Sequence, residues 1–210
     1  MKSIVTLFLI VSIALPIIAQ NLQVGVSSGI NFPDLHSDVD GLGKRQKEDK
    51  KRTLLFGIGM YYRINPNISL HSAVLYEERG WREKNVYTIS EDFVYPFITT
   101  PVLIEFNLGK TIEIFANTGI NNSLRIGGKS KTGNGAPPVH FIFPEDKKPL
   151  FDFGWVGGAG LRLSTKGKLT FQMEYRYYRS WTTIGIKPLD SAIKHQGCIG
   201  SLAAYYKISK

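Results

Sequence analysis

The sequence predicts an all-β fold, an eight-stranded antiparallel up-and-down transmembrane β-barrel. Three observations lead to this prediction: an N-terminal export signal, an apolar–polar alternation that recurs in eight segments, and connections that are alternately long and short. A period of two is the pattern of strands that present one apolar face. Strands of this kind, paired in sequence order, are typical of small barrels in the outer membrane.

The N-terminal segment has the parts of a cleaved secretory signal peptide. Lys2 supplies a positive charge, an apolar stretch runs over residues 4–18, and Ala19 is a small residue at the expected cleavage position. The stretch is too short for a membrane-spanning helix, which needs about 20 apolar residues. We therefore expect residues 1–19 to be removed and residues 20–210 to form one exported barrel domain.

Eight later segments alternate between apolar residues on one face and polar, charged or glycine residues on the other. In the second segment, Phe56, Ile58 and Met60 share one face, and Gly57 and Gly59 lie on the other. Most segments have about 9–13 residues, enough to cross a bilayer at the usual tilt, whereas strands of soluble sheets have about 5–6. The expected strands are residues 22–30, 54–64, 68–77, 94–108, 112–121, 151–163, 169–177 and 198–208.

The connections provide a second regularity, because long and short ones alternate strictly. In an up-and-down barrel this places all long loops at one end, which faces outward, and all tight turns at the periplasmic end together with both termini. The tight turns are expected at residues 65–67, 109–110 and 164–167, and the long loops at residues 31–52, 79–93, 127–150 and 182–194.

The fourth strand contains two prolines, Pro96 and Pro101. Proline removes a hydrogen-bond donor from the ladder between strands. We therefore expect a bulge or an irregular start near residues 99–101.

The composition limits the kinds of site that the chain can build. The formal charge is +9, or +8 without Lys2 (25 basic minus 17 acidic residues), and such a balance attracts phosphate groups. Export separates the chain from cytoplasmic nucleic acid, so lipid and lipopolysaccharide are the expected anionic partners. One cysteine, Cys198, allows neither a disulfide nor a zinc site, and no histidine pair has metal-ligand spacing. We expect no cofactor, no metal and no catalytic residue.

The polar faces of the predicted strands collect charged residues that would line the barrel interior. Eight strands leave an interior just wide enough for side chains to fill. Charges there must pair, because an unpaired buried charge is costly. Four acids face three arginines, so near neutrality is attainable, and an ion or proton path through them is the alternative. The expected lumen ion pairs involve Arg63, Glu77, Glu105, Glu113, Arg162, Glu174 and Arg176, with His71 on the same face.

Two patterns that could indicate chemistry lack the context they need. Ser69 and Ser72 flank His71, but alternation places Ser72 on the opposite face, and no hydrolase motif surrounds them. Residues 157–160 are rich in glycine, but a strand follows them rather than the helix that a phosphate-binding loop requires. Close packing is the simpler reason for these glycines.

The first long loop contains the strongest charge run of the chain. Its six bases and two acids give a local charge of +4, which suits either a solvated loop or contacts with lipopolysaccharide phosphates. The bases of this basic surface loop are Lys44, Arg45, Lys47, Lys50, Lys51 and Arg52.

Three of the predicted strands resemble those of PorT-like outer-membrane β-barrel proteins. Residues 95–108 resemble the family's "Tyr…Ile-Pro-Leu-Leu" strand, residues 151–161 its "Asp-Phe-Gly…Gly-Ala-Gly" strand, and residues 169–177 its "Glu-Ala-Arg-Tyr" strand. The sequence differs at Glu105, where the family often has Lys or Arg. The resemblance covers most of the exported chain and implies an outer-membrane location, but its motifs are structural and imply no substrate.

These observations favour a non-enzymatic outer-membrane scaffold that displays surface loops, with a role in envelope integrity, adhesion or secretion. Its expected contacts are outer-membrane lipid, lipopolysaccharide, the barrel-insertion machinery, and a surface or secretion partner that the sequence does not identify. A narrow ion or small-solute channel is one alternative. A soluble periplasmic lipocalin-like barrel that binds an apolar ligand is another, and it requires the apolar faces to point inward.

Overall fold

The computed structural model describes residues 21–37, 47–48, 52–84, 90–132, 139–141, 151–182, 184–186 and 189–208. The predicted signal peptide lies outside these residues, so its cleavage stays a prediction. Within the described residues there is no helix long and apolar enough to cross a membrane.

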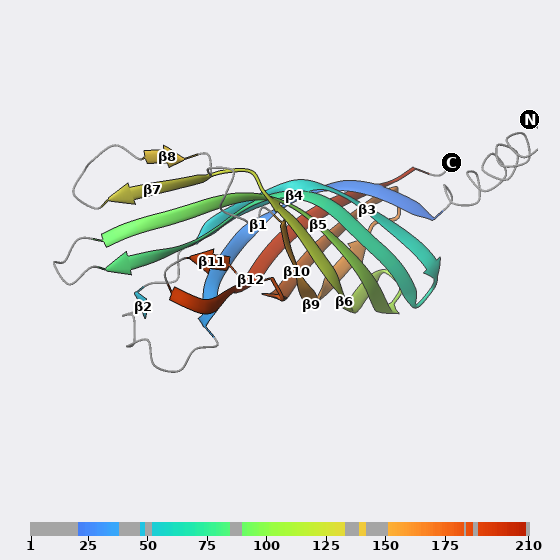
Figure 1. Cartoon of the computed structure of the whole chain (residues 1–210). Helices are drawn as coiled ribbons and strands as arrows, with labels where there is room; N and C mark the ends of the chain where they lie inside the picture. Colours follow the sequence, from blue (N-terminus) through green and yellow to red (C-terminus); the bar gives the residue numbers. More distant parts are fainter. Residues whose placement is uncertain are drawn as a thin grey trace, which may run out of the picture.

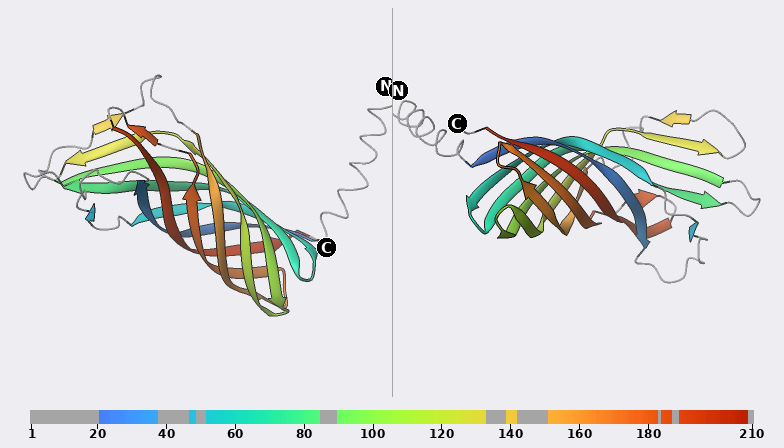
Figure 2. Two further views of the ribbon diagram at one scale, coloured as in Figure 1. Left: turned by 60° about the horizontal axis from the view of Figure 1, so that its bottom comes forward. Right: turned by 180° about the vertical axis from the view of Figure 1, so that it is seen from behind.

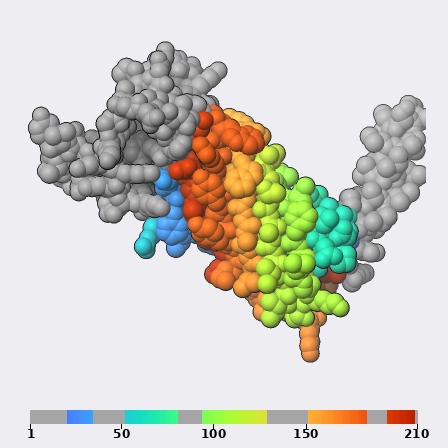
Figure 3. All heavy atoms as spheres, turned by 90° about the horizontal axis from the view of Figure 1, so that it is seen from below, coloured from blue at the N-terminus to red at the C-terminus, as the bar shows by residue number. Residues whose placement is uncertain are grey.

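Eight long antiparallel strands in the described part of the chain form a closed barrel, which confirms the predicted fold (Figure 1). Each pairs with its neighbours in sequence, the pairing of β4 with β5 completes the sheet, and the first strand pairs with the last. Figure 3 shows β12, β10, β9 and β6 side by side along the wall. The eight strands are β1 Leu22–Ser37, β3 Thr53–Asn65, β4 Ile68–Lys84, β5 Ser90–Gly109, β6 Ile112–Arg125, β9 Phe151–Ser164, β10 Leu169–Ser180 and β12 Leu189–Lys207.

Several strands continue beyond the closed barrel, so the expected loops are shorter than predicted. β4 runs to Lys84 and β5 begins at Ser90, which turns most of the loop expected at residues 79–93 into strand. The apolar–polar alternation does not reveal these extensions, because charged residues there occur on both faces of the strands. The extensions and four short strands lie at one end of the barrel (Figures 1 and 2). The short strands are β2 Lys47–Glu48, β7 Gly128–Thr132, β8 Val139–Phe141 and β11 Ile184–Ile186.

The three tight turns lie where they were predicted, at the opposite end. In the first, Asn65 Oδ1 accepts hydrogen bonds from the backbone N–H groups of Asn67 and Ile68 at 2.9 and 2.8 Å. In the second, Gly109 has φ of +115°, a left-handed conformation that a side chain would strain. Local turn chemistry therefore fixes the register of the flanking strands.

The prolines of β5 do not produce the expected bulge. Ser72 pairs with Val102 and Leu75 with Thr99, so both strands advance by the same number of residues past Pro101. The ladder is irregular here but keeps its register. Ser72 Oγ donates to the carbonyl oxygen of Pro101 at 2.9 Å and supports this part of the strand.

The apolar faces of the strands point outward and the polar faces inward. Ile58 and Leu108 are 64% and 69% exposed, whereas Glu105 and Arg162 are 0% and 1% exposed. An outward apolar surface is the arrangement of a barrel in lipid. It contradicts the lipocalin-like alternative, which needs an apolar interior.

Alternation within the predicted strand at residues 94–108 would turn Val94 outward together with Leu108, but Val94 is buried. At this point β5 has left the closed barrel: residues 91–94 pair with β7, whereas pairing with β6 begins at Phe97. The outward face of the barrel wall therefore does not continue to Val94.

Candidate functional site

The barrel interior holds three groups of charged side chains at successive levels between the tight turns and the long connections. The turn-end group comprises Arg63, Glu105, Glu113 and Arg162. The middle group comprises His71, Glu174 and Arg176. The loop-end group comprises Glu77, Arg79 and Asp152.

Arg162 is the centre of the turn-end group. The strand register places it opposite Glu113 on β6 and Gln172 on β10, so these side chains share the inner face. Its Nη2 atom lies 2.5 Å from Glu105 Oε1, and its Nη1 atom lies 3.3 Å from Glu113 Oε2. Nη2 also donates to Gln172 Oε1 at 2.7 Å. One guanidinium therefore neutralises carboxylates from two other strands.

Aromatic rings complete the packing around Arg162. Its guanidinium carbon lies 4.0 Å from the ring centroid of Tyr61 and 4.8 Å from that of Phe115. The Phe115 ring occupies space that Gly160 leaves open, since a Cβ at Gly160 would lie 2.5 Å from a ring carbon. Gly160 thus makes room for an interior ring, as expected from close packing.

Arg63 closes the turn-end group on the side of the tight turns. Its Nη2 atom lies 2.6 Å from Glu113 Oε1, and its side chain is 29% exposed. Glu113 therefore has two arginine partners, Arg63 and Arg162.

The middle group joins residues from four strands. Arg176 Nε lies 2.6 Å from Glu174 Oε1, and Asn117 Nδ2 donates to the same oxygen at 2.5 Å. His71 Nδ1 lies 3.3 Å from Arg176 Nη2, while His71 Nε2 lies 2.8 Å from the hydroxyl oxygen of Tyr205. These bonds occupy both ring nitrogens of His71.

The loop-end group contains two residues that the sequence did not assign to ion pairs. Arg79 forms ion pairs with Glu77 and Asp152, and its guanidinium carbon lies 4.5 and 4.8 Å from the ring centroids of Phe97 and Tyr178. Arg79 was missed because it was assigned to a loop, although its spacing from Glu77 continues the inward parity of β4. Alternation within the predicted strand at residues 151–163 places Asp152 on the inward face, but it does not reveal the partner of this carboxylate.

The interior is balanced in charge within the described residues. Four buried arginines and the half-buried Arg63 match five buried acids. The arginines are Arg63, Arg79, Arg125, Arg162 and Arg176, and the acids are Glu77, Glu105, Glu113, Asp152 and Glu174. Because buried charges are costly without partners, this balance is what allows so many of them in one interior.

The described contacts bring together no catalytic constellation. Ser69 Oγ donates to the Tyr61 hydroxyl at 2.6 Å and Ser72 Oγ bonds a backbone carbonyl, so neither serine is joined to His71 by these bonds. The described residues contain no cluster of three or more His, Cys, Asp or Glu side chains that could hold a metal ion.

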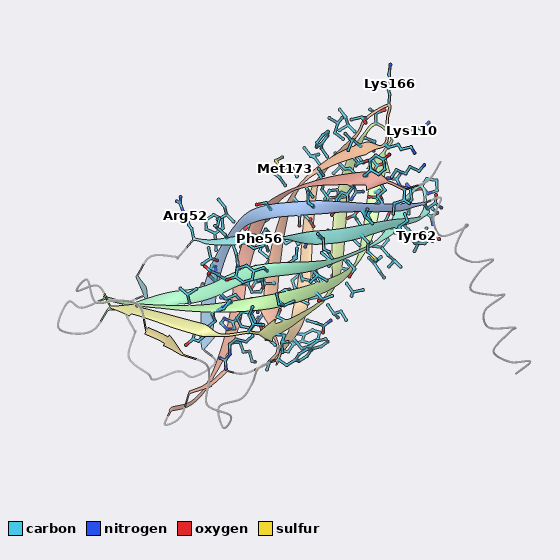
Figure 4. The ribbon with its side chains drawn as sticks, turned by 90° about the horizontal axis from the view of Figure 1, so that it is seen from above. Arg52, Phe56, Tyr62, Lys110, Lys166 and Met173 are labelled. Carbon is cyan, nitrogen blue, oxygen red and sulfur yellow. The ribbon has the colours of Figure 1, made fainter. Side chains whose placement is uncertain are left out.

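The basic surface loop is only partly described. Lys47 lies in β2 opposite Glu83 of β4, and Arg52 is exposed at the start of β3. Figure 4 shows Arg52 at the end of the barrel away from Lys110 and Lys166. Lys47 and Arg52 therefore lie at the long-connection end. Lys44, Arg45, Lys50 and Lys51 lie outside the described residues.

Comparisons with known proteins identify relatives of the same architecture. A sequence model of the family "outer membrane protein beta-barrel domain" matches residues 18–184. No curated protein sequence matches the chain. The outer membrane protein OprG from Pseudomonas aeruginosa is 11% identical with a TM-score of 0.54, and the alignment covers 89% of this chain and 95% of OprG. This likeness shows the barrel fold alone.

Two further solved structures are similar over most of the chain. Neisserial surface protein A is 14% identical with a TM-score of 0.47, covering 89% of this chain and 96% of that chain. Ail, the attachment invasion locus protein of Yersinia pestis, solved with the heparin analogue sucrose octasulfate, is 17% identical with a TM-score of 0.43. That alignment covers 88% of this chain and 98% of Ail.

Proposed function

Since this chain belongs to the outer membrane protein beta-barrel domain family, we propose that it is a closed, non-enzymatic scaffold whose activity resides in its surface loops. The protein lies in the outer membrane, in contact with its lipid. The observation that supports a scaffold is the filled interior. Activity beyond architecture then belongs to the loops, because loops on a rigid scaffold commonly carry function.

Three levels of side chains obstruct the bore. Near the turns, the Arg162 guanidinium is packed against Tyr61 and Phe115. At the other end, the Arg79 guanidinium is packed against two more rings and is 0% exposed. An ion that crossed would have to break these charge pairs. Barrels with open aqueous channels have about 16–18 strands, twice the number found here.

A conductance measurement tests the closed bore. The full chain, folded and heat-modifiable on a gel, should give no stable current in a planar bilayer. A large porin measured in the same bilayers verifies that insertion is detectable. A steady current that disappears when the protein is unfolded by heat would contradict the scaffold and favour the narrow-channel alternative.

The basic surface loop is the proposed contact with lipopolysaccharide. The loop carries a local charge of +4, and its described residues Lys47 and Arg52 lie at the barrel end that faces outward in such proteins, where anionic sugars and phosphates are plentiful. Salt should weaken the contact, because charges at a surface are screened. We include in this proposal a role in envelope integrity, adhesion or secretion. We also include the narrower assignment of the chain to the PorT-like proteins.

A loop variant tests this contact. Changing Lys47, Lys50, Lys51 and Arg52 to glutamine should weaken lipopolysaccharide binding and its salt dependence while the heat-modifiable fold persists. As a matched control, Lys110→Gln combined with Lys166→Gln removes charge from the opposite end and should leave binding unchanged. Equal binding by the loop variant and the native protein would refute the loop assignment.

A further inference from the structure

The end of the barrel formed by the tight turns carries exposed charge of one sign. Lys110 lies in the turn between β5 and β6, Lys166 and Lys168 lie in the turn between β9 and β10, and Lys207 ends β12. All four are exposed, and Figure 4 shows Lys110 and Lys166 projecting from this end. Among the described residues of this end, the acid nearest to the turns is Glu113, which is buried.

The acid at this end cannot neutralise the lysines. Glu113 is 1% exposed and forms its ion pairs inside the barrel with Arg63 and Arg162. The four exposed lysines therefore present a local charge of +4 to whatever lies beside the turns. Without a bound anion, these charges repel one another.

Two of these lysines, Lys110 and Lys168, lie at the edge of the apolar surface. Lys110 stands between Leu108 and Ile112, which are 69% and 65% exposed. The ammonium nitrogen of Lys168 lies 5.8 Å from the ring centroid of Tyr206, an outward-facing side chain that is 49% exposed. Tyrosine is enriched at the boundary between lipid tails and water, and lysine extends its ammonium from there toward headgroups.

We propose that this turn-end lysine surface, Lys110, Lys166, Lys168 and Lys207, binds anionic phospholipid headgroups of the periplasmic leaflet. The position of Lys110 and Lys168 beside lipid-facing leucine, isoleucine and tyrosine matches the depth of headgroup phosphates. It does not match the depth of the cell-wall polymer, whose carboxylates lie farther into the periplasm. Lipopolysaccharide belongs to the other leaflet, next to the long connections.

The expected strength follows from simple surface electrostatics. A lysine near an anionic membrane surface increases binding by about fivefold at moderate ionic strength. The four lysines are distributed around one end, so each neighbouring lipid meets one or two of them. We therefore expect a severalfold preference for an anionic over a zwitterionic phospholipid, decreasing at high salt.

The test compares two labelled lipids around the intact barrel. The full chain is reconstituted in phosphatidylcholine vesicles with a minor fraction of phosphatidylglycerol, and spin-labelled phosphatidylglycerol or phosphatidylcholine reports the motionally restricted shell. The native protein should select phosphatidylglycerol severalfold at low salt. The variant with glutamine at Lys110, Lys166, Lys168 and Lys207 should lose most of this preference and keep its heat-modifiable fold.

Two controls separate this inference from other sources of selectivity. The variant of the basic surface loop removes a similar charge from the opposite end and should retain the preference. Isolated peptidoglycan sacculi should sediment the native protein no more than they sediment the variant in which the four lysines are glutamine. The inference is overturned if the native protein shows no preference, if the turn-end variant keeps it, if the loop variant loses it, or if the sacculi bind through these lysines.

Discussion

Replacing Arg162 by methionine should be among the most destabilising single changes in the barrel. Within the described residues, Glu105 forms its ion pair with Arg162 and is 0% exposed, so the variant leaves a buried carboxylate without its partner. Breaking a buried pair in this way costs about 3–5 kcal/mol. Glu113 loses less, because Arg63 remains 2.6 Å away.

The companion change at Arg63 provides a matched control. Arg63 is 29% exposed and its partner Glu113 keeps Arg162, so Arg63→Met should cost at most about 1 kcal/mol. Adding Glu105→Gln to Arg162→Met removes the stranded charge. The double variant should therefore be more stable than Arg162→Met alone, by about 1–3 kcal/mol.

The measurement is the urea dependence of unfolding in lipid vesicles, followed by tryptophan fluorescence and by the heat-modifiable band on a gel. If the Arg162→Met protein were as stable as the Arg63→Met protein, or more stable, the loss of the buried pair would not carry the expected cost. If Glu105→Gln further destabilised the Arg162→Met protein, the unpaired carboxylate would not be the source of that cost.

Three further outcomes are expected. Gly160→Ala should destabilise by about 1–3 kcal/mol, because the new Cβ would overlap a ring and a backbone oxygen, and Gly200→Ala, with no atom within 4 Å, serves as its control in the same urea assay. Gly109→Ala should cost about 1–2 kcal/mol because of its left-handed φ, and a shift smaller than that of Gly200→Ala would contradict this reason. Protease added to intact cells should cut within residues 41–52 and spare residues 65–67, whereas cleavage only after permeabilisation would reverse the assigned orientation.

Alternation along the chain indicates which residues face the lumen within the closed barrel. The period of two assigned Glu105, Arg162 and Glu174 to the inner face, where the structure places them. This works because lipid on one side and a narrow interior on the other impose opposite chemistry on successive residues. That contrast ends near the rim of the barrel. There, alternation did not predict that Arg79 forms ion pairs in the lumen or that Val94 is buried.

The partners of the lumen residues could not be predicted in the same way. Arg162 contacts the hydroxyl of Tyr61, 101 positions away, because the curvature of the closed sheet brings β3 and β9 to face one another. Neighbouring strands reveal their register through turn lengths, but contacts across the interior depend on the tilt of the strands and the size of the barrel. Neither quantity is encoded in any single segment.

The seam between β1 and β12 has a consequence for biogenesis. Its register runs from Gln23 opposite Lys207 to Ser37 opposite Ile193. The first strand to be synthesised therefore cannot complete its pairing until the last strand is available. Until then both edges expose unpaired backbone groups, which invite pairing with other chains. The hydrogen bond between His71 and Tyr205, 134 positions apart, likewise forms only on closure. A chain truncated before its final strand should therefore remain a client of periplasmic chaperones, and closure becomes the step at which quality control can distinguish a finished molecule from an unfinished one.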